Sequence, residues 1–197
     1  MPFKFLYQSN DKDNLMPKQT KRKRTVPDLN AIELLSVVNA LCMLNKANLL
    51  FIESFLAPGN KVVFKKYMKA VESAMSFQHG DRYTPEEIWD FDKLEQVLLS
   101  YRLSTNDDTM LAALYTFATE ESHAITMNLG DIDEDYYHSM GKLYEDTCKI
   151  VADLKQNKTQ MELISRLKKI HDESQNIGWG YGFDLDESYS RYLADRV

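Results

Sequence analysis

Residues 106–154 have the sequence NDDTMLAALYTFATEESHAITMNLGDIDEDYYHSMGKLYEDTCKIVADL, in which apolar side chains recur at the spacing of two α-helices. The apolar face of the first helix carries Met110, Leu111, Leu114, Phe117, Ala118 and Ile125. That of the second carries Tyr136, Met140, Leu143, Ile150, Val151 and Leu154. Between them, Gly130 suits the left-handed conformation that ends a helix, and Asp131 or Asp133 is placed to cap the next one. Because such faces are stable only when buried, the pattern predicts a helical hairpin packed against further elements.

Between residues 26 and 77, the sequence predicts three helices. The first is capped by Asp28 and carries a dense apolar series as far as Leu44. Two asparagines in residues 45–48 predict a break, because asparagine is a poor helix former, and a second short helix then runs to Leu56. A third is expected from Asn60 to about Phe77.

Other helix starts are marked by capping residues. Thr84 precedes a proline and two glutamates, and Asp92 precedes another apolar series. Beyond the hairpin, Thr159 and Glu162 form a capping box, and Asp186 is placed to cap a last short helix. These signals predict helical structure along the rest of the chain.

The fold class that follows is all-α, with no sheet, because no convincing strand alternation appears. We expect a compact array of about eight or nine short amphipathic helices packed as antiparallel hairpins. The sequence shows no strict repeat, which argues against a regular solenoid. Residues 1–25 are predicted to form a flexible basic arm, and residues 26–197 a single helical domain.

Charge is distributed unevenly along the 197 residues. Seven Lys or Arg against two Asp give residues 1–24 a formal charge of +5. Because the net charge of the chain is −6, the remaining residues carry −11. The acidic body therefore disfavours non-specific binding of nucleic acid by the folded part, because it would repel the phosphate backbone.

The two cysteines, Cys42 and Cys148, lie within apolar helical patterns and form no Cys-x-x-Cys pair. Buried thiols in a reducing compartment are therefore expected. No segment reaches the roughly 18 uninterrupted apolar residues of a membrane span, and no secretory signal is apparent. These features predict a cytoplasmic protein without a membrane partner.

The basic cluster at the end of the arm consists of Lys21, Arg22, Lys23 and Arg24. It has three interpretations: a solubilising arm, a contact with nucleic acid or another acidic surface, or a nuclear-import signal in a eukaryotic source. Four clustered charges would add only modest, salt-sensitive affinity.

Glycines alternate with large aromatic residues at Trp179, Tyr181 and Phe183. This segment is expected either to fold onto the helical body as an aromatic plug or to present the rings as anchors for a partner. The candidate partner-binding residues are these three aromatics and the acidic turn residues Asp131, Asp133 and Glu134.

Two carboxylate-x-x-histidine spacings, Glu120 with His123 and Asp135 with His138, match those used at di-iron centres. At about 100° per residue, both histidines lie nearly opposite the apolar faces of their helices. The pattern therefore predicts solvent-exposed histidines, and no metal site, cofactor or catalytic residue is assigned.

Glu121, by contrast, falls near the middle of the apolar face of its helix, where an unpaired carboxylate is costly. Three alternatives follow. The carboxylate is paired with a tyrosine or lysine, it has a raised pKa that marks a functional pocket, or it lies at a helix edge that is less buried than the pattern indicates.

The element GDIDEDYYHSM at residues 130–140 and the element IGWG at residues 177–180 resemble those of an uncharacterised bacterial family of helical proteins. The matching positions are Gly130, Asp131, Ile132, Asp133, Tyr137, Ser139, Met140, Ile177, Gly178, Trp179 and Gly180. The resemblance covers about half of the chain. It implies a helical architecture and a bacterial or phage origin, and it supplies no activity.

The sequence contains neither a Gly-x-Ser-x-Gly elbow nor a Gly-x-x-x-x-Gly-Lys phosphate loop. The leading hypothesis is therefore a non-enzymatic protein–protein interaction module, one subunit of a bacterial or phage assembly. One alternative is a nucleic-acid accessory protein that binds through the basic arm. Another is a small-molecule or metal enzyme with a pocket around Glu121. The oligomeric state stays open.

Overall fold

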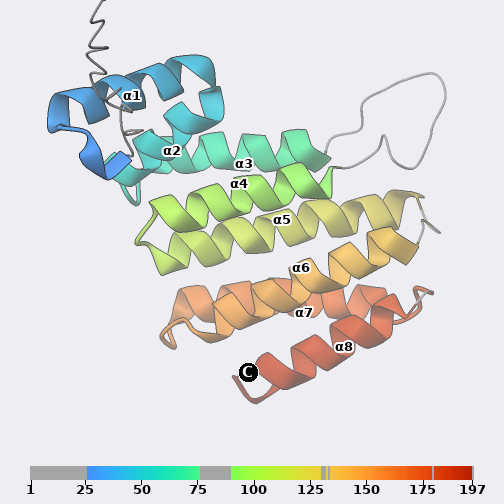
Figure 1. Cartoon of the computed structure of the whole chain (residues 1–197). Helices are drawn as coiled ribbons and strands as arrows, with labels where there is room; N and C mark the ends of the chain where they lie inside the picture. Colours follow the sequence, from blue (N-terminus) through green and yellow to red (C-terminus); the bar gives the residue numbers. More distant parts are fainter. Residues whose placement is uncertain (1–25, 76–89, 130–131, 133, 179, 197) are drawn as a thin grey trace, which may run out of the picture. The chain divides into compact units, whose positions relative to one another are not determined.

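The computed structural model describes residues 26–75, 90–129, 132, 134–178 and 180–196 (Figure 1). These residues form eight α-helices and two short 3₁₀ helices and contain no strand, so the predicted all-α class is confirmed. The helices are η1 (Val26–Asp28), α1 (Ala31–Leu44), α2 (Lys46–Leu56), α3 (Lys61–Met75), α4 (Phe91–Ser104), α5 (Asp108–Leu129), α6 (Glu134–Ala152), α7 (Lys158–Ser174), α8 (Tyr181–Tyr192) and η3 (Ala194–Arg196).

The chain divides into two compact units, residues 1–39 and residues 40–197, and the boundary falls inside α1. It therefore lies within the segment expected to form a single domain from residue 26 onward. Of the first unit, the structure describes residues 26–39, and the rest of the basic arm lies outside the described residues.

Asparagine and aspartate side chains begin most of the helices. The break at residues 45–48 is confirmed, because Asn45 separates α1 from α2 and its side chain accepts a 2.8 Å hydrogen bond from the backbone N–H of Ala47. Asn60 caps α3 in the same way, with Val62 as donor at 2.8 Å. These side chains satisfy backbone donors that have no partner within the helix.

Four predicted helix starts are wrong by a few residues. Asn30, not Asp28, begins α1, since its side-chain oxygen accepts from the N–H groups of Ile32 and Glu33 at 3.0 Å each. The helix predicted at Asp92 instead follows the cap Asp90.

The other two starts lie in the last third of the chain. Helix α7 is capped by Asn157, whose side chain accepts from the N–H of Gln160 at 2.9 Å, so Thr159 lies inside the first turn. Helix α8 begins at Tyr181 rather than after Asp186, because the left-handed Gly180 (φ 76°) ends the preceding segment. The predicted start at Thr84 lies outside the described residues.

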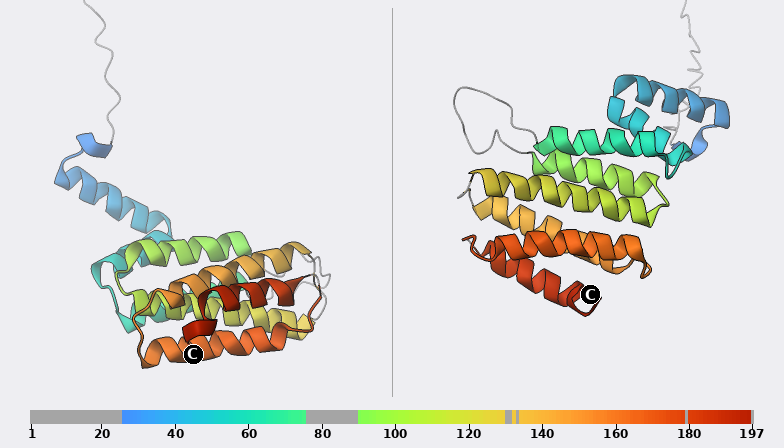
Figure 2. Two further views of the ribbon diagram at one scale, coloured as in Figure 1. Left: turned by 90° about the horizontal axis from the view of Figure 1, so that it is seen from below. Right: turned by 180° about the vertical axis from the view of Figure 1, so that it is seen from behind.

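Helix α5 is central to the second unit and contacts α3, α4, α6 and α7 (Figure 1, Figure 2). Helices α4 to α8 follow one another as antiparallel hairpins, so α5 and α7 run in the same direction (Figure 1). Large side chains that are almost completely buried fill this unit: Tyr67, Tyr101, Tyr136, Tyr137, Tyr144, Tyr181, Leu94, Leu114, Met140, Leu167, Leu185 and Leu193.

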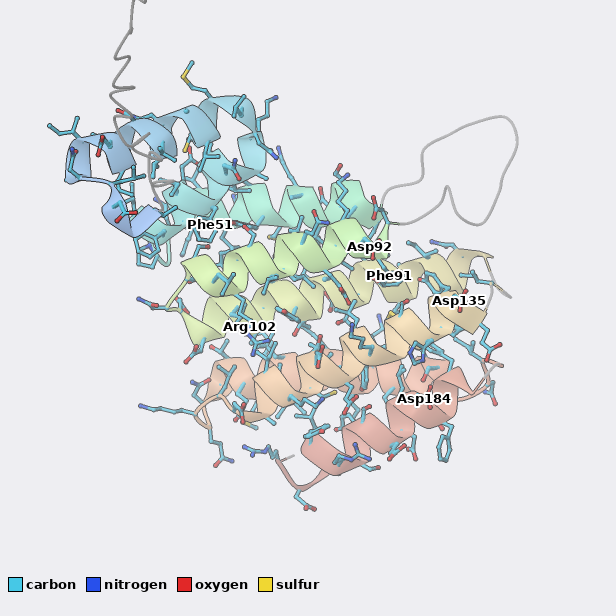
Figure 3. The ribbon with its side chains drawn as sticks, viewed as in Figure 1. Phe51, Phe91, Asp92, Arg102, Asp135 and Asp184 are labelled. Carbon is cyan, nitrogen blue, oxygen red and sulfur yellow. The ribbon has the colours of Figure 1, made fainter. Side chains whose placement is uncertain are left out.

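Aromatic rings join the helices of this core. Phe91, in the first turn of α4, packs edge-on against Tyr136 of α6, with ring centroids 5.5 Å apart (Figure 3). Tyr67 of α3 packs similarly against Tyr101 of α4, at 4.7 Å. Cys148 of α6 is buried, as predicted, whereas Cys42 is partly exposed, and both thiols are free.

Candidate functional site

A stripe of small polar side chains runs along the buried side of α5. Its members are Thr116, Thr119, Ser122 and Thr126, all nearly or completely buried. The first three hydroxyls each donate a 2.9 Å hydrogen bond to the carbonyl four residues earlier, which satisfies them within the helix. Because these side chains are small, other helices can pack closely against this side of α5 as well as against its leucine side.

His123 continues this stripe and is only 4% exposed. Its Nδ1 atom lies 3.1 Å from the hydroxyl oxygen of Tyr181, on α8. Its Nε2 atom faces a carboxylate oxygen of Glu173, on α7, at 3.4 Å, without the geometry of a hydrogen bond. Burial lowers the pKa of the imidazole, and the nearby Glu173 carboxylate partly opposes this effect.

The prediction that His123 faces solvent is therefore wrong. The helical pattern identified the leucine face of α5, whereas a second face is also covered by other helices. The spacing of the small residues Thr116, Thr119, Ser122 and Thr126 is the signal that could have revealed this second buried face.

Three tyrosines pack together next to His123 and its neighbour Ser122. The hydroxyl of Tyr136 donates to the backbone carbonyl of Ser122. The ring of Tyr137 lies 5.7 Å from that of Tyr136 and 5.1 Å from that of Tyr181. Burial raises the pKa values of both Tyr136 and Tyr181. These phenols therefore stay protonated at neutral pH and act as hydrogen-bonding groups in a tightly packed interior.

A cleft of about 420 Å³ between α5 and α7 leads to the outer edge of His123. At one end, Arg166 donates to both carboxylate oxygens of Glu120, through Nε at 2.7 Å and through Nη2. Glu173 lies at the other end, and Lys169, which lies between the two ends, approaches it at 3.7 Å. The cleft thus combines charges of both signs with a buried, titratable ring.

The predicted partner-binding residues have different environments. Tyr181 is completely buried, so its expected role as an exposed anchor is wrong, because the ring completes the core beneath His123. Phe183 is 71% exposed, and Glu134 is exposed in the first turn of α6. Trp179, Asp131 and Asp133 lie outside the described residues, as does the basic cluster of Lys21, Arg22, Lys23 and Arg24.

Glu121 and the two histidines His123 and His138 do not form a common site. Glu121 is partly buried, so the helix-edge alternative describes it best; burial, followed by the charges of Glu72 and Glu120, raises the pKa of its carboxyl. His138 is exposed, as predicted, and lines a different cleft from His123. Within the described ranges, no group of three or more His, Cys, Asp or Glu side chains is arranged to hold a metal ion.

Helix α1 forms the most apolar exposed surface that the structure describes. Only Glu33, Ser36 and Asn39 of its 14 residues are polar. Every residue of the helix is described, and none is buried: Ile32 is 79% exposed and Met43 is 89% exposed. Among the described residues, no helix is long and apolar enough to cross a membrane.

Comparison with known proteins adds no assignment to this geometry. The chain matches no family model, no curated protein and no solved structure. The resemblance to a bacterial helical family therefore stays a prediction from the sequence.

Proposed function

We propose that this chain is a non-enzymatic protein–protein interaction module that uses the apolar side chains of α1 to bind another protein chain. The supporting observation is that α1 combines an almost entirely apolar sequence with the absence of any buried residue. A helix that is apolar all round is normally buried, so a partner that covers it gains the free energy of removing this surface from water.

The two sides of α1 define what the partner must offer. Ile32 and Met43 lie within about 20° of each other around the helix axis, and Leu41 lies on the opposite side, where it is 47% exposed. A contact on one side would therefore leave apolar side chains exposed on the other. The partner surface must therefore contact more than one side of α1. Because the helix carries a single charged residue, Glu33, this surface is expected to be apolar and uncharged.

Membership of a bacterial or phage assembly is the finer form of this proposal, and it rests on the family resemblance. In such an assembly, α1 is covered by a neighbouring subunit, while the acidic body stays in solvent.

Affinity capture from the native host tests the proposal with two matched pairs of substitutions. Ile32→Gln with Met43→Gln removes two apolar side chains from α1. Leu103→Gln with Met161→Gln removes two exposed apolar side chains from α4 and α7, where they are 66% and 57% exposed. Circular dichroism of each purified variant checks that the helices are retained.

We expect the wild type and the α4/α7 variant to retain the same protein in a fixed ratio, and the α1 variant to lose it. After purification, that protein should bind the wild type at least about tenfold more tightly than the α1 variant. Retention of the same proteins by all three chains, or of none by the wild type, contradicts the proposal.

A further inference from the structure

The cleft between α5 and α7 has a buried histidine nitrogen at its floor. His123 lines the cleft and is 4% exposed, and its Nε2 atom, 3.4 Å from a carboxylate oxygen of Glu173, has no hydrogen-bond partner among the described residues. A buried polar atom without a partner is unfavourable, and native proteins pair most such atoms with protein, water or ligand. A ligand group that reaches this nitrogen would remove that cost.

The proton arrangement on the ring determines which ligand group fits. If Nδ1 carries the proton, it donates to the Tyr181 hydroxyl oxygen, 3.1 Å away, and Nε2 presents a lone pair to the cleft. Glu173 presents a carboxylate to the same place and is 39% exposed. A neutral imidazole nitrogen and a carboxylate together accept hydrogen bonds from an ammonium group.

The opposite end of the cleft presents donors. Arg166 uses Nε and Nη2 for its bidentate pair with Glu120, and this geometry leaves Nη1 directed away from that carboxylate. Lys169 lies between the two ends, is 75% exposed and holds Glu173 only loosely, at 3.7 Å. These cations suit a carboxylate.

The charges of the cleft balance, with Glu120 and Glu173 opposing Arg166 and Lys169. A purely anionic ligand would lie beside two carboxylates, and a purely cationic one beside two cations. Arg166 and Glu173 are seven residues apart on α7, which separates their Cα atoms by about 10 Å along the helix axis. A ligand with both charges, separated by a short chain, satisfies both ends.

We propose that the cleft between α5 and α7 binds a small zwitterion, with its ammonium group on His123 Nε2 and Glu173 and its carboxylate group on Arg166 and Lys169. The apolar chain between the two groups lies along Ile170, which lies between Arg166 and Glu173 on α7 and forms part of the wall of the cleft. The loose pair of Lys169 with Glu173 opens on binding, because the ligand supplies each of them with a new partner.

The experiment is a titration of the purified full chain, followed through the imidazole signals of His123 in NMR spectra and through isothermal calorimetry. The probe is 6-aminohexanoate, and hexanoate and hexylammonium serve as analogues that each carry one of its two charges. We expect saturable binding of the zwitterion, with affinity at least about tenfold higher than that of either analogue.

Two variants show whether the response comes from this cleft. Glu173→Gln removes the carboxylate at the ammonium end and should weaken binding of 6-aminohexanoate by about tenfold. Glu95→Gln makes the same change on α4, outside the cleft, and should leave binding unchanged. Absence of a saturable response to the zwitterion, equal binding of either analogue, or equal effects of the two substitutions overturns the proposal.

Discussion

Among single residues, His123 makes the stability of the second unit depend on pH, because its imidazole is buried in the packed interior. Its ring is enclosed by α5, α7 and α8, and burial lowers its pKa below the ordinary histidine value near 6.5. The unfolded chain therefore takes up the proton first as the pH falls, and the free energy of unfolding falls with it. The stability that the neutral imidazole contributes is complete above about pH 6.5 and is lost progressively below it.

Replacing His123 should reduce this pH dependence. Between pH 7 and pH 5.5, we expect the wild type to lose on the order of 1 kcal/mol more stability than His123→Asn, because the variant has no imidazole to protonate. Urea unfolding at several pH values measures the difference. His138→Asn, a change at an exposed histidine, is the control and should lose as much stability as the wild type. Parallel pH profiles for the wild type and His123→Asn would show that His123 is protonated equally in both states.

Glu121 changes the stability of the fold with pH in the opposite direction. Burial and the charges of Glu72 and Glu120 raise the pKa of its carboxyl in the folded chain, so its ionisation destabilises the folded state as the pH rises through and above its ordinary range. At pH 7, Glu121→Gln should therefore raise the free energy of unfolding, by less than about 1 kcal/mol because the group is partly solvated. Urea unfolding tests this, and a loss of stability would indicate a favourable partner for the carboxylate.

The sequence could identify Glu121 as unusual, because a carboxylate on an apolar face is visible in the helical pattern. The apolar pattern alone could not identify the environment of His123. The apolar pattern finds the leucine side of α5, whereas His123 is buried by contacts from α7 and α8, which lie some fifty residues further along the chain. Which helices cover the second side of α5 is a property of the tertiary structure.

At the scale of helices, capping and close approach set where each element begins. The sequence predicted the helices and most connections, but it placed several caps a few residues away from Asn30, Asp90, Asn157 and Gly180. Several residues near each start could serve as a cap, and packing selects among them. The start of α8 at Tyr181 is one example, because the left-handed Gly180 precedes it and the Tyr181 ring is buried beside His123.

Gly182, in the first turn of α8, is required by a close approach between helices. A Cβ atom at this position would lie 2.7 Å from the carbonyl oxygen of Ser174 at the end of α7, so α8 would have to move. We expect Gly182→Ala to lower the free energy of unfolding by about 1–3 kcal/mol. Gly178→Ala is the matched control, since a Cβ there meets nothing within 4 Å, and its effect should stay within about 0.5 kcal/mol. Equal unfolding midpoints for the two variants would contradict this packing.

Gln160 connects the start of α7 to the end of α6. It is 2% exposed, and its side-chain amide donates to the carbonyl oxygens of Val151 and Leu154 at 2.9 Å and 3.0 Å. Gln160→Met keeps the size of the side chain and removes both donors, so we expect a loss of about 1–3 kcal/mol in urea unfolding. The same substitution at the exposed Gln96 should change stability by less than about 0.5 kcal/mol, and a similar loss at both sites would exclude this capping role.

At the scale of the whole molecule, the described residues combine a packed helical unit with a helix, α1, in which no residue is fully buried. The all-α class follows directly from the apolar spacing along the chain. The unit boundary inside α1 does not, because the dense apolar series of residues 31–44 predicts a core helix. An apolar pattern predicts that a helix surface will be buried, but it does not predict whether the same chain or another chain buries it.

The most direct test of the interaction proposal is site-specific photo-cross-linking in the native host. A photoreactive amino acid replaces Met43 on α1 in one chain and Met161 on α7 in another, and cross-linked products are identified by mass spectrometry. We predict one dominant protein partner at position 43 and none of it at position 161. If position 43 yields no partner, or if both positions yield the same proteins in equal amounts, α1 is not the interaction surface.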